Sequence, residues 1–479
     1  MYDAVVVGSG PNGLAAAAVL GREGYSVLVV EAASSPGGGT RTEELTLPGY
    51  LHDVCSAVHP LAVASPLFRS LELEKHGVTW CHAKAPLAHV LDDERALTLE
   101  RSVAETAAQL GRDRARYEDL VTPLVERFDD LVEMFVGPLQ FPRRPLLGLR
   151  FARNALLSMK CLAQRFEAPE ARALLAGAAA HSMLPLDVAG TAAFALILAV
   201  SGHAVGWPVA EGGSHSIARA LLAQIDGFGG EVWLDHRVRS RGDLPPARVY
   251  LFDVTPRQLL AIDDGWLPDS YRKRLARYRY GPGVFKIDWA LDGPVPWRNP
   301  ACRRATTIHL WGQAGQMHAA ESAPHDGRVA EQPFVLFVQP TLADPSRAPW
   351  GKHTGWAYCH VPAFSHHDIT ARIEAMVERF APGFRDLILA RHTRNAAQME
   401  EYNPNFVGGD INGGAATLDQ LFFRPVVSLD PYSTPNPRVF LCSSATPPGG
   451  GVHGLCGSFA AKSALRRLRG SHEPPRLLG

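Results

Sequence analysis

The chain has 479 residues, which is well beyond the roughly 250 to 300 residues at which a single hydrophobic core stops growing, so we expect two lobes. Its 48 basic and 48 acidic side chains balance, which removes any global electrostatic attraction to nucleic acid or to an anionic membrane. Seven cysteines occur without a C-x-x-C pair, so the sequence predicts free thiols in a reducing compartment and no metal site.

The first forty residues carry the most informative motif. An apolar run at 2–7 is followed by the glycine-rich sequence GSGPNG at 8–13, an alanine-rich stretch, and a second apolar run that ends at Glu31. This order predicts a strand, a helix and a strand that bind a dinucleotide, with the helix N-terminus facing phosphate and Glu31 accepting a hydrogen bond from a ribose hydroxyl. An ordinary glycine-rich turn is the alternative, but it does not account for the spaced acid. Because the first strand begins at Tyr2, we expect no targeting peptide and a cytoplasmic location.

The hydrophobic pattern predicts the remaining elements in chain order. Apolar residues recur at three- and four-residue spacing from about 102 to 166, which predicts helices. The apolar stretch 189–200 is too short to span a bilayer and predicts a buried helix, or alternatively a surface that dips into lipid. We expect strands at 231–238, 248–254, 284–291 and 439–442, and helices at 371–380 and 455–469.

Two glycine-rich turns lie near opposite ends of the chain, each between a predicted strand and a predicted helix. The first is 8–13 and the second is 449–451. Their positions suggest one nucleotide domain assembled from distant pieces, with a second lobe inserted between them. We then expect the ligand in the crevice where the lobes meet.

The segment Gly37-Gly38-Gly39-Thr40-Arg41 resembles the second glycine motif of the FAD-containing amine oxidase and phytoene desaturase superfamily. Four later segments are similar to further cofactor motifs of this superfamily: 212–214, 236–238, 251–256 and 443–454. Within it, the segment 49–59 most resembles the phytoene-desaturase-like branch that includes proteins with a pyridine nucleotide-disulfide oxidoreductase domain 2.

This resemblance implies an α/β fold with a Rossmann-like FAD-binding domain of the glutathione-reductase type, built from the segments 1–90, 205–265 and 395–479. An α+β substrate domain is then inserted as 91–204 and 266–394, with a helical part at 100–204 and a strand-rich part at 280–394. The residues expected to hold FAD are Gly8, Gly10, Pro11, Asn12, Gly13, Glu31, Gly38, Gly39, Thr40, Arg41, Val238, Thr255, Ser444, Gly450, Gly451, Val452 and His453.

Three residues are candidates for the chemistry. Lys286 lies on an alternating strand similar to the one on which amine oxidases carry a lysine bound through water to flavin N5; the alternative is a solvated lysine on a half-exposed strand. His453 follows three glycines and would reach flavin or substrate, or else cap the last helix. His59 lies, by resemblance, on a loop near the flavin ring, together with Asp53, which alternatively anchors a turn.

Aromatic residues in the middle of the chain are candidates for a pocket lining, although such residues are more often core. They are the tryptophans at 289, 297, 311, 350 and 356 and Tyr358.

The predicted function is an FAD-dependent oxidoreductase that dehydrogenates or desaturates an apolar organic molecule, such as an isoprenoid, a carotenoid-like compound or a secondary metabolite. Apart from 449–454, which falls within the C-terminal flavin-motif segment, no second G-x-G-x-x-G motif occurs, so electrons are expected to pass to oxygen or a quinone and not to a separate NAD domain. A flavin amine oxidase and a redox-neutral flavin isomerase are the alternatives. A non-catalytic protein like the Rab GDP-dissociation inhibitors is less favoured, because the cofactor segments persist. The expected partner is a small apolar substrate, without nucleic acid, and peripheral membrane contact is one route by which it would arrive.

Overall fold

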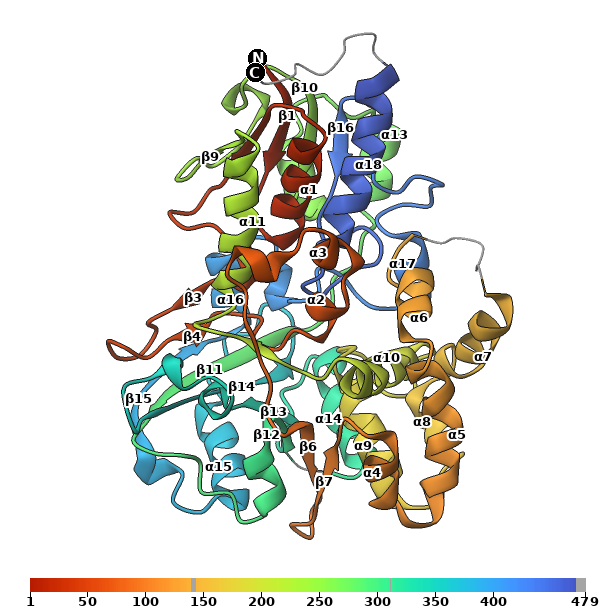
Figure 1. Ribbon diagram of the computed structural model, residues 1–479, viewed down its shortest axis with the longest axis vertical. Coiled ribbons are helices and arrows are strands. Elements are labelled where there is room, and N and C mark those ends of the chain that lie inside the picture. The colour runs from red at the N-terminus through yellow and green to blue at the C-terminus, as the bar shows by residue number, and fades with distance from the viewer. Residues whose placement is uncertain (139–143, 311, 471–479) are drawn as a thin grey trace.

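The computed structural model describes residues 1–138, 144–310 and 312–470, and it contains two main β-sheets (Figure 1). The first is a five-stranded sheet in the order β16-β10-β1-β2-β9, and every neighbouring pair in it is parallel. Its strands are β1 (Tyr2–Val7), β2 (Val27–Val30), β9 (Glu231–Trp233), β10 (Ala247–Phe252) and β16 (Val439–Leu441). Three distant parts of the chain therefore build one sheet, as the two glycine-rich turns predicted.

Helices cover both faces of this sheet, which is why its strands are almost entirely apolar. Ala4 and Val6 point to a layer formed by α1 (Pro11–Arg22), α11 (His215–Gly227) and α18 (Leu455–Gly470). Val5 and Val7 point to the opposite layer, which contains α12 (Pro256–Ile262) and α13 (Asp269–Leu275). The alternation of side chains along β1 thus supplies two separate cores.

The second sheet has seven strands in the order β15-β11-β14-β13-β12-β6-β7. These are β6 (Ala85–Val90), β7 (Ala96–Leu99), β11 (Gly283–Leu291), β12 (Ala305–Leu310), β13 (Val335–Val338), β14 (His353–Val361) and β15 (Ile388–Arg394). Phe285, Ile287 and Trp289 of β11 share one face and pack with α15 (Thr370–Phe380), as the alternating pattern predicted. The other face of this sheet is directed toward the five-stranded domain and the helices.

The helical part surrounds a large apolar cluster to one side of the second sheet (Figure 1). It consists of α4 (Val103–Ala108), α5 (Arg114–Val125), α6 (Phe128–Phe135), α7 (Pro145–Ala155), α8 (Met159–Ala163), α9 (Pro169–Ala180), α10 (Thr191–Ala204) and α14 (Ala314–Ser322). Helix α10 contains residues 191–200 of the predicted apolar stretch 189–200 and is largely buried, as expected. In the described part of the chain, none of the helices has the length and apolar character needed to cross a membrane.

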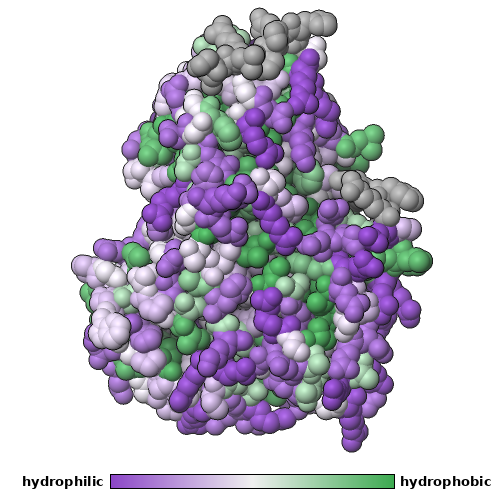
Figure 2. All heavy atoms as spheres, in the orientation of Figure 1, coloured by the Kyte–Doolittle hydropathy of each residue, from purple (hydrophilic) through white to green (hydrophobic). Residues whose placement is uncertain are grey.

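Short elements connect these layers. They are α2 (Pro60–Ala64), α3 (Pro66–Ser70), α16 (Ala396–Tyr402), α17 (Leu418–Phe423), the strand pair β3 (Thr42–Glu43) with β4 (His52–Asp53), and the pair β5 (Trp80–Cys81) with β8 (Val209–Ala210). Figure 2 shows a mainly hydrophilic surface, with hydrophobic residues gathered near the middle of the visible face, between the upper and lower parts.

The predicted α/β fold is confirmed, and three boundaries change. The strand expected at 231–238 ends at Trp233, because Asp235 has a positive φ of 54° that turns the chain. Strand β6 pairs with β12 and β7, so residues 85–90 belong to the second sheet and not to the first segment of the cofactor domain. Helix α13 packs on the five-stranded sheet, so this domain extends beyond residue 265.

Candidate cofactor and substrate cavity

A cavity of about 430 Å³ lies between the two sheets, and it is lined from both ends and from the middle of the chain. One end is formed by the N-terminal glycine loop together with Gly38, Gly39, Arg41 and the segments 236–238 and 253–255. The other end is formed by the second sheet and by α10. The segment 443–452 also contributes to the wall. A single cavity therefore joins the predicted nucleotide motifs to an inserted lobe.

The glycines of the first two motifs lie against one another. Gly8 has a φ of 102°, a conformation that favours glycine. A Cβ atom on Gly10 would lie 2.7 Å from Asp253 Oδ2, and a Cβ atom on Gly38 would lie 3.0 Å from the Cα of Gly10. Because helix α1 begins at Pro11, its N-terminus and bare backbone lie at the cavity wall, an arrangement suited to a pyrophosphate.

Glu31 is buried at this end of the cavity, and both of its carboxylate oxygens accept hydrogen bonds. One carboxylate oxygen accepts hydrogen bonds from the N–H of Ser9 at 2.9 Å and from its hydroxyl at 2.6 Å. The other accepts from the N–H of Ala33 at 2.9 Å and lies 3.3 Å from Nη2 of Arg41. Glu31 thus holds the glycine loop and Arg41 in place, while both side chains remain in the cavity wall.

Three other polar groups at this end fit a dinucleotide. The Asn12 Oδ1 atom is buried, belongs to a cavity-lining residue and has no hydrogen-bond partner within the described ranges, and the buried Thr255 hydroxyl also lines the cavity. A buried polar atom without a partner carries a cost unless a ligand or water satisfies it. Asp253 accepts from the N–H of Gly13 at 2.9 Å, and burial raises the pKa of its carboxyl group to about 7. The donor and acceptor set therefore fits a bound dinucleotide.

The C-terminal motif joins the same wall. A Cβ atom on Gly450 would lie 2.9 Å from the carbonyl oxygen of Asn412, and Gly451 has a φ of 120°. Of the residues predicted to hold the cofactor, those that line the cavity are Gly8, Gly10, Pro11, Asn12, Glu31, Gly38, Gly39, Arg41, Val238, Thr255, Ser444, Gly450, Gly451 and Val452. Gly13, Thr40 and His453 lie behind it.

These three residues support the wall. A Cβ atom on Gly13 would lie 2.2 Å from the carbonyl oxygen of Gly8, so Gly13 allows the close packing of helix and loop. The hydroxyl of Thr40 donates to the Gly37 carbonyl at 2.8 Å. His453 Nδ1 accepts from the N–H of Leu455 at 3.0 Å, at the start of α18. The capping alternative therefore describes the observed position of His453.

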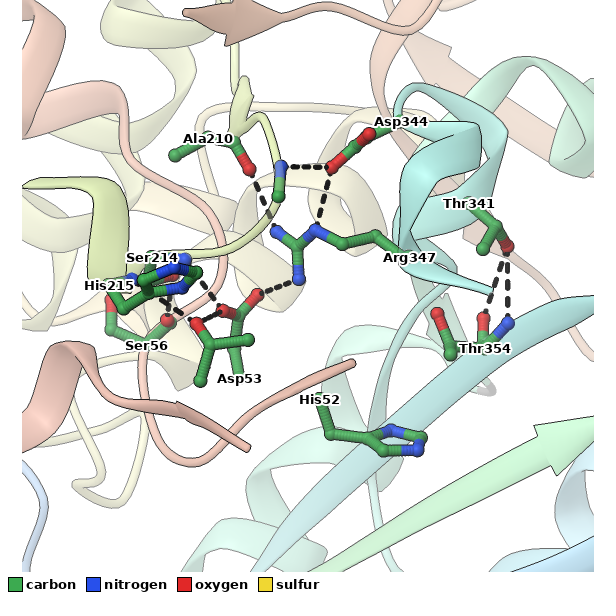
Figure 3. Close-up of polar contacts among 12 residues, drawn as sticks. His52, Asp53, Ser56, Ala210, Ser214, His215, Thr341, Asp344, Arg347 and Thr354 are labelled. Atoms are coloured by element: carbon green, nitrogen blue, oxygen red, sulfur yellow. Dashed lines mark hydrogen bonds and ion pairs between the residues drawn. The ribbon is translucent and has the colours of Figure 1, made fainter. Parts of the chain in front are cut away.

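Asp53 belongs to a buried polar network (Figure 3), and His59 joins this network through Ser214. Nε2 of His59 lies 2.8 Å from the hydroxyl of Ser214, and burial lowers the pKa of His59 to about 4. Asp53 accepts from the N–H of Ser214 at 2.8 Å and from Nη1 of Arg347 at 2.9 Å. Arg347, with no exposed side-chain surface, also donates through Nε to Asp344 at 2.7 Å. This network joins β4 to the turn Pro345–Arg347 of the inserted lobe.

Lys286 is not among the described residues that line the cavity. Its side chain is 3% exposed, so the alternative of a solvated lysine is wrong. The ammonium group pairs with the carboxylate of Asp288 and lies 5.1 Å from the ring centroid of Trp356, which does line the cavity. Lys286 is buried because the face of β11 that it shares with Asp288 is covered by the rest of the protein.

The floor of the substrate end is one face of the seven-stranded sheet. Thr307, Val338 and Trp356 lie opposite one another on β12, β13 and β14. Leu336 and Tyr358 form the next pair on the same face, two residues along. All five line the cavity, and the rings of Trp356 and Tyr358 stack with centroids 5.6 Å apart.

Of the aromatic candidates, Trp356 and Tyr358 are thus at the cavity, whereas Trp289 and Trp297 are core residues and Trp350 is fully exposed. Trp311 lies outside the described residues. Sequence reasoning missed the remaining members of the substrate end, since nothing in their local pattern marks them. They include Cys55, Ala57, His181, Leu198, Trp207, Thr307, Leu336, Val338 and Phe406.

The fold and this cavity define a protein with a Rossmann-like dinucleotide-binding domain joined to a second, ligand-facing sheet. Residues 6–71 match the family described as NAD(P)-binding Rossmann-like domain. The chain is 27% identical to pyridine nucleotide-disulfide oxidoreductase domain-containing protein 2 of Rattus norvegicus, over 98% of this chain and 94% of that protein. It is 26% identical to a phytoene dehydrogenase of Streptomyces griseus, over 97% of this chain and 95% of that one.

A solved structure shows the same fold. Cyclohexylamine oxidase from Brevibacterium oxydans matches with a TM-score of 0.63 and 17% identity, over 98% of this chain and all of that one. The predicted resemblance to phytoene-desaturase-like proteins is therefore confirmed by sequence, and the likeness to an amine oxidase is one of fold. The chain is similar over nearly its whole length to oxidoreductases.

Proposed function

We propose that this protein binds FAD and dehydrogenates or desaturates a largely apolar organic substrate, of the isoprenoid, carotenoid-like or secondary-metabolite type. One observation carries the proposal: a single cavity runs from the paired glycine loops at the N-terminus of α1 to an apolar face of the second sheet. The second G-x-G-x-x-G of the sequence, at 449–454, lines the same cavity as the first, so a flavin and a substrate would share this space.

The residues that would hold FAD are those at the cofactor end. The backbone of 8–12 and the N-terminus of α1 would bind the diphosphate, and Arg41 would supply a fixed positive charge beside it. Ser444 and 450–452 would bind the part of the cofactor nearest the second lobe. When bound, the flavin supplies the hydride acceptor.

The inserted lobe would orient the substrate and exclude water. Leu198, Leu336 and Val338 provide apolar contact surface, and Trp207 and Trp356 add aromatic surface. Positioning of this kind accounts for a large part of the rate when the cofactor carries the chemistry. Oxygen or a quinone is the proposed electron acceptor.

The amine oxidase alternative has less support. It rested on Lys286, whose ammonium group is occupied by Asp288 behind the cavity wall.

The visible spectrum of the purified protein tests the proposal. We expect flavin absorption bands, and anaerobic addition of a substrate from a panel of polyenes, terpenes and amines should bleach them. Gly10→Ala should weaken FAD binding by roughly tenfold or more, because its methyl group would meet Asp253 beside the diphosphate site. Gly227→Ala is the matched control, because within the described parts of the chain nothing lies within 4 Å of the added carbon. A protein that stays colourless after addition of FAD would overturn the proposal.

A further inference from the structure

The substrate end of the cavity is apolar in its centre but contains a hydroxyl group without a partner. Thr307 is 3% exposed and lines the cavity, and its Oγ1 atom makes no hydrogen bond within the described parts of the chain. Leaving a buried hydroxyl unpaired costs about 1 to 3 kcal/mol. A core position of this kind is usually apolar, and a valine would have nearly the same shape.

A buried hydroxyl without a partner does not by itself make a site. Thr306, the preceding residue, also has an unpartnered Oγ1 and is fully buried, but it does not line the cavity. Because side chains alternate along a strand, Thr306 points to the opposite face of β12. The two threonines therefore differ in one respect, which is access to the ligand space.

His181 supplies a second polar group at the same end. It lines the cavity and is half-buried, and its Nε2 lies 3.1 Å from Nε2 of His309. His309 is two residues from Thr307 on β12, so both side chains lie on the same face of the sheet. This arrangement brings His181 to the part of the cavity wall where Thr307 is found.

The contact between the two imidazoles determines what His181 can offer to a ligand. Burial lowers the pKa of His181 to about 3 and that of His309 well below its ordinary value, so both rings are neutral. In a contact between two neutral imidazoles, one Nε2 donates and the other accepts. When His181 donates, its Nδ1 is an acceptor; when it accepts, its Nδ1 carries a proton and donates. His181 can therefore present either a donor or an acceptor to a ligand.

We propose that the substrate is an apolar molecule with one polar group, a hydroxyl, carbonyl or amine, that hydrogen-bonds to Thr307 Oγ1 and His181 Nδ1. This inference rests on the proposed function and narrows its substrate class, because it excludes an unfunctionalised hydrocarbon as the preferred ligand. Both protein groups can donate or accept, so they serve all three kinds of polar group.

Equilibrium binding of three probes with one carbon skeleton tests this proposal. Farnesene is the hydrocarbon, and farnesol and farnesylamine carry one polar group each. Binding is measured by quenching of tryptophan fluorescence, since Trp207 and Trp356 line the cavity. We expect at least one of the two polar probes to bind the wild-type protein roughly threefold to tenfold more tightly than farnesene. This difference is the effect of one well-placed hydrogen bond.

Matched variants assign the preference to the site. Thr307→Val should reduce the preference for the polar probe to near unity, and His181→Phe should reduce it as well. Thr306→Val should leave it unchanged. The proposal is overturned if farnesene binds as tightly as both polar probes, if none of the three binds, or if the preference survives in Thr307→Val.

The same measurement separates this proposal from the one on which it rests. Fluorescence reports binding whether or not the protein is yellow. A protein that never binds FAD yet prefers farnesol would contradict the proposed function alone. A yellow protein without the preference would contradict the polar-group proposal alone.

Discussion

Gly457 of α18 lies directly against the carbonyl oxygen of Asn12 in α1, and a Cβ atom on this glycine would be only 1.8 Å from that oxygen. The last helix therefore packs on the first turn of the first helix, at the point where the cofactor loop ends. A side chain at 457 would meet backbone atoms, which cannot move aside as a flexible side chain can.

We expect Gly457→Ala to destabilise the protein by about 3 kcal/mol or more and to weaken FAD binding, since it separates α18 from the glycine loop. Chemical denaturation and the bound flavin content measure the two effects. Gly470→Ala in the same helix is the control, because no atom of the described residues lies within 4 Å of the added carbon. Equal stability of the two variants would show that the helices do not need this close contact.

Asp253 predicts a pH dependence of folding. Burial raises the pKa of its carboxyl group to about 7 from an ordinary value of 3.8. Between these two values the folded protein holds the proton more tightly than the unfolded chain, so the contribution of Asp253 to stability falls as pH rises through this window and is constant above it. Asp253→Asn should remove this fall, measured by denaturation at a series of pH values. An unchanged pH profile in the variant would exclude Asp253 as its source.

The same carboxyl group should affect the binding of FAD. Its Oδ2 lies beside Gly10, where the diphosphate is expected, so a bound anion favours the protonated form. Affinity for FAD should fall by up to about tenfold per pH unit above pH 7 in the wild-type protein, and less in Asp253→Asn. Titration of the apoprotein with FAD at pH 6 and pH 8 measures this difference.

The sequence was sufficient to predict the cofactor end of the cavity, because each motif that forms this end is a short contiguous segment. A β-type run, a glycine loop and a spaced acid lie within 31 residues, and each has its own steric reason. The second and C-terminal motifs are also contiguous segments that could be recognised one at a time. Most of the residues predicted from them do line the cavity.

The substrate end could not be predicted in this way. Thr307, Val338 and Trp356 share one face only because β12, β13 and β14 pair in a particular register. His181 arrives from a different segment, after α9, and no pattern around it indicates a cavity. Lys286 shows the same limit: its strand was predicted, but the burial of its polar face depends on distant segments.

Arg347 should be essential for stability and not only for binding. It is fully buried between Asp53 and Asp344, and it also donates to the carbonyl of Ala210 at 2.9 Å. Removing one partner of a buried ion pair typically costs about 3 to 5 kcal/mol, so Arg347→Met should lower the free energy of unfolding by about this amount. Arg328→Met is the comparison, because its ion pair with Asp326 is exposed and should contribute less than about 1 kcal/mol. Chemical denaturation measures the free energy of unfolding of the two variants. If both lose only a little stability, the network does not hold the two lobes together.

Asp53 should make this network sensitive to acid. Burial alone would raise the pKa of Asp53, but the charge of Arg347 and hydrogen bonds from Ser214 and Thr42 outweigh that effect and hold the pKa below 3.8. A carboxyl group with a lowered pKa contributes stability above its unfolded value and loses that contribution as pH falls through its folded value. The loss in Arg347→Met should therefore be largest at neutral pH and should shrink below about pH 4.

Lys286 offers a test that separates structure from chemistry. Lys286→Met leaves the buried carboxylate of Asp288 without its cation, so we expect a loss of about 3 to 5 kcal/mol in the free energy of unfolding. The double variant Lys286→Met with Asp288→Leu removes both charges and should recover most of that loss, since a buried ion pair can often be replaced by apolar residues at little cost. If Lys286 only positions Trp356 and the sheet, the double variant should also recover the rate at which substrate bleaches the flavin. Recovered stability with a rate that remains low would instead assign Lys286 a part in the reaction, as its similarity to the lysine of amine oxidases suggests.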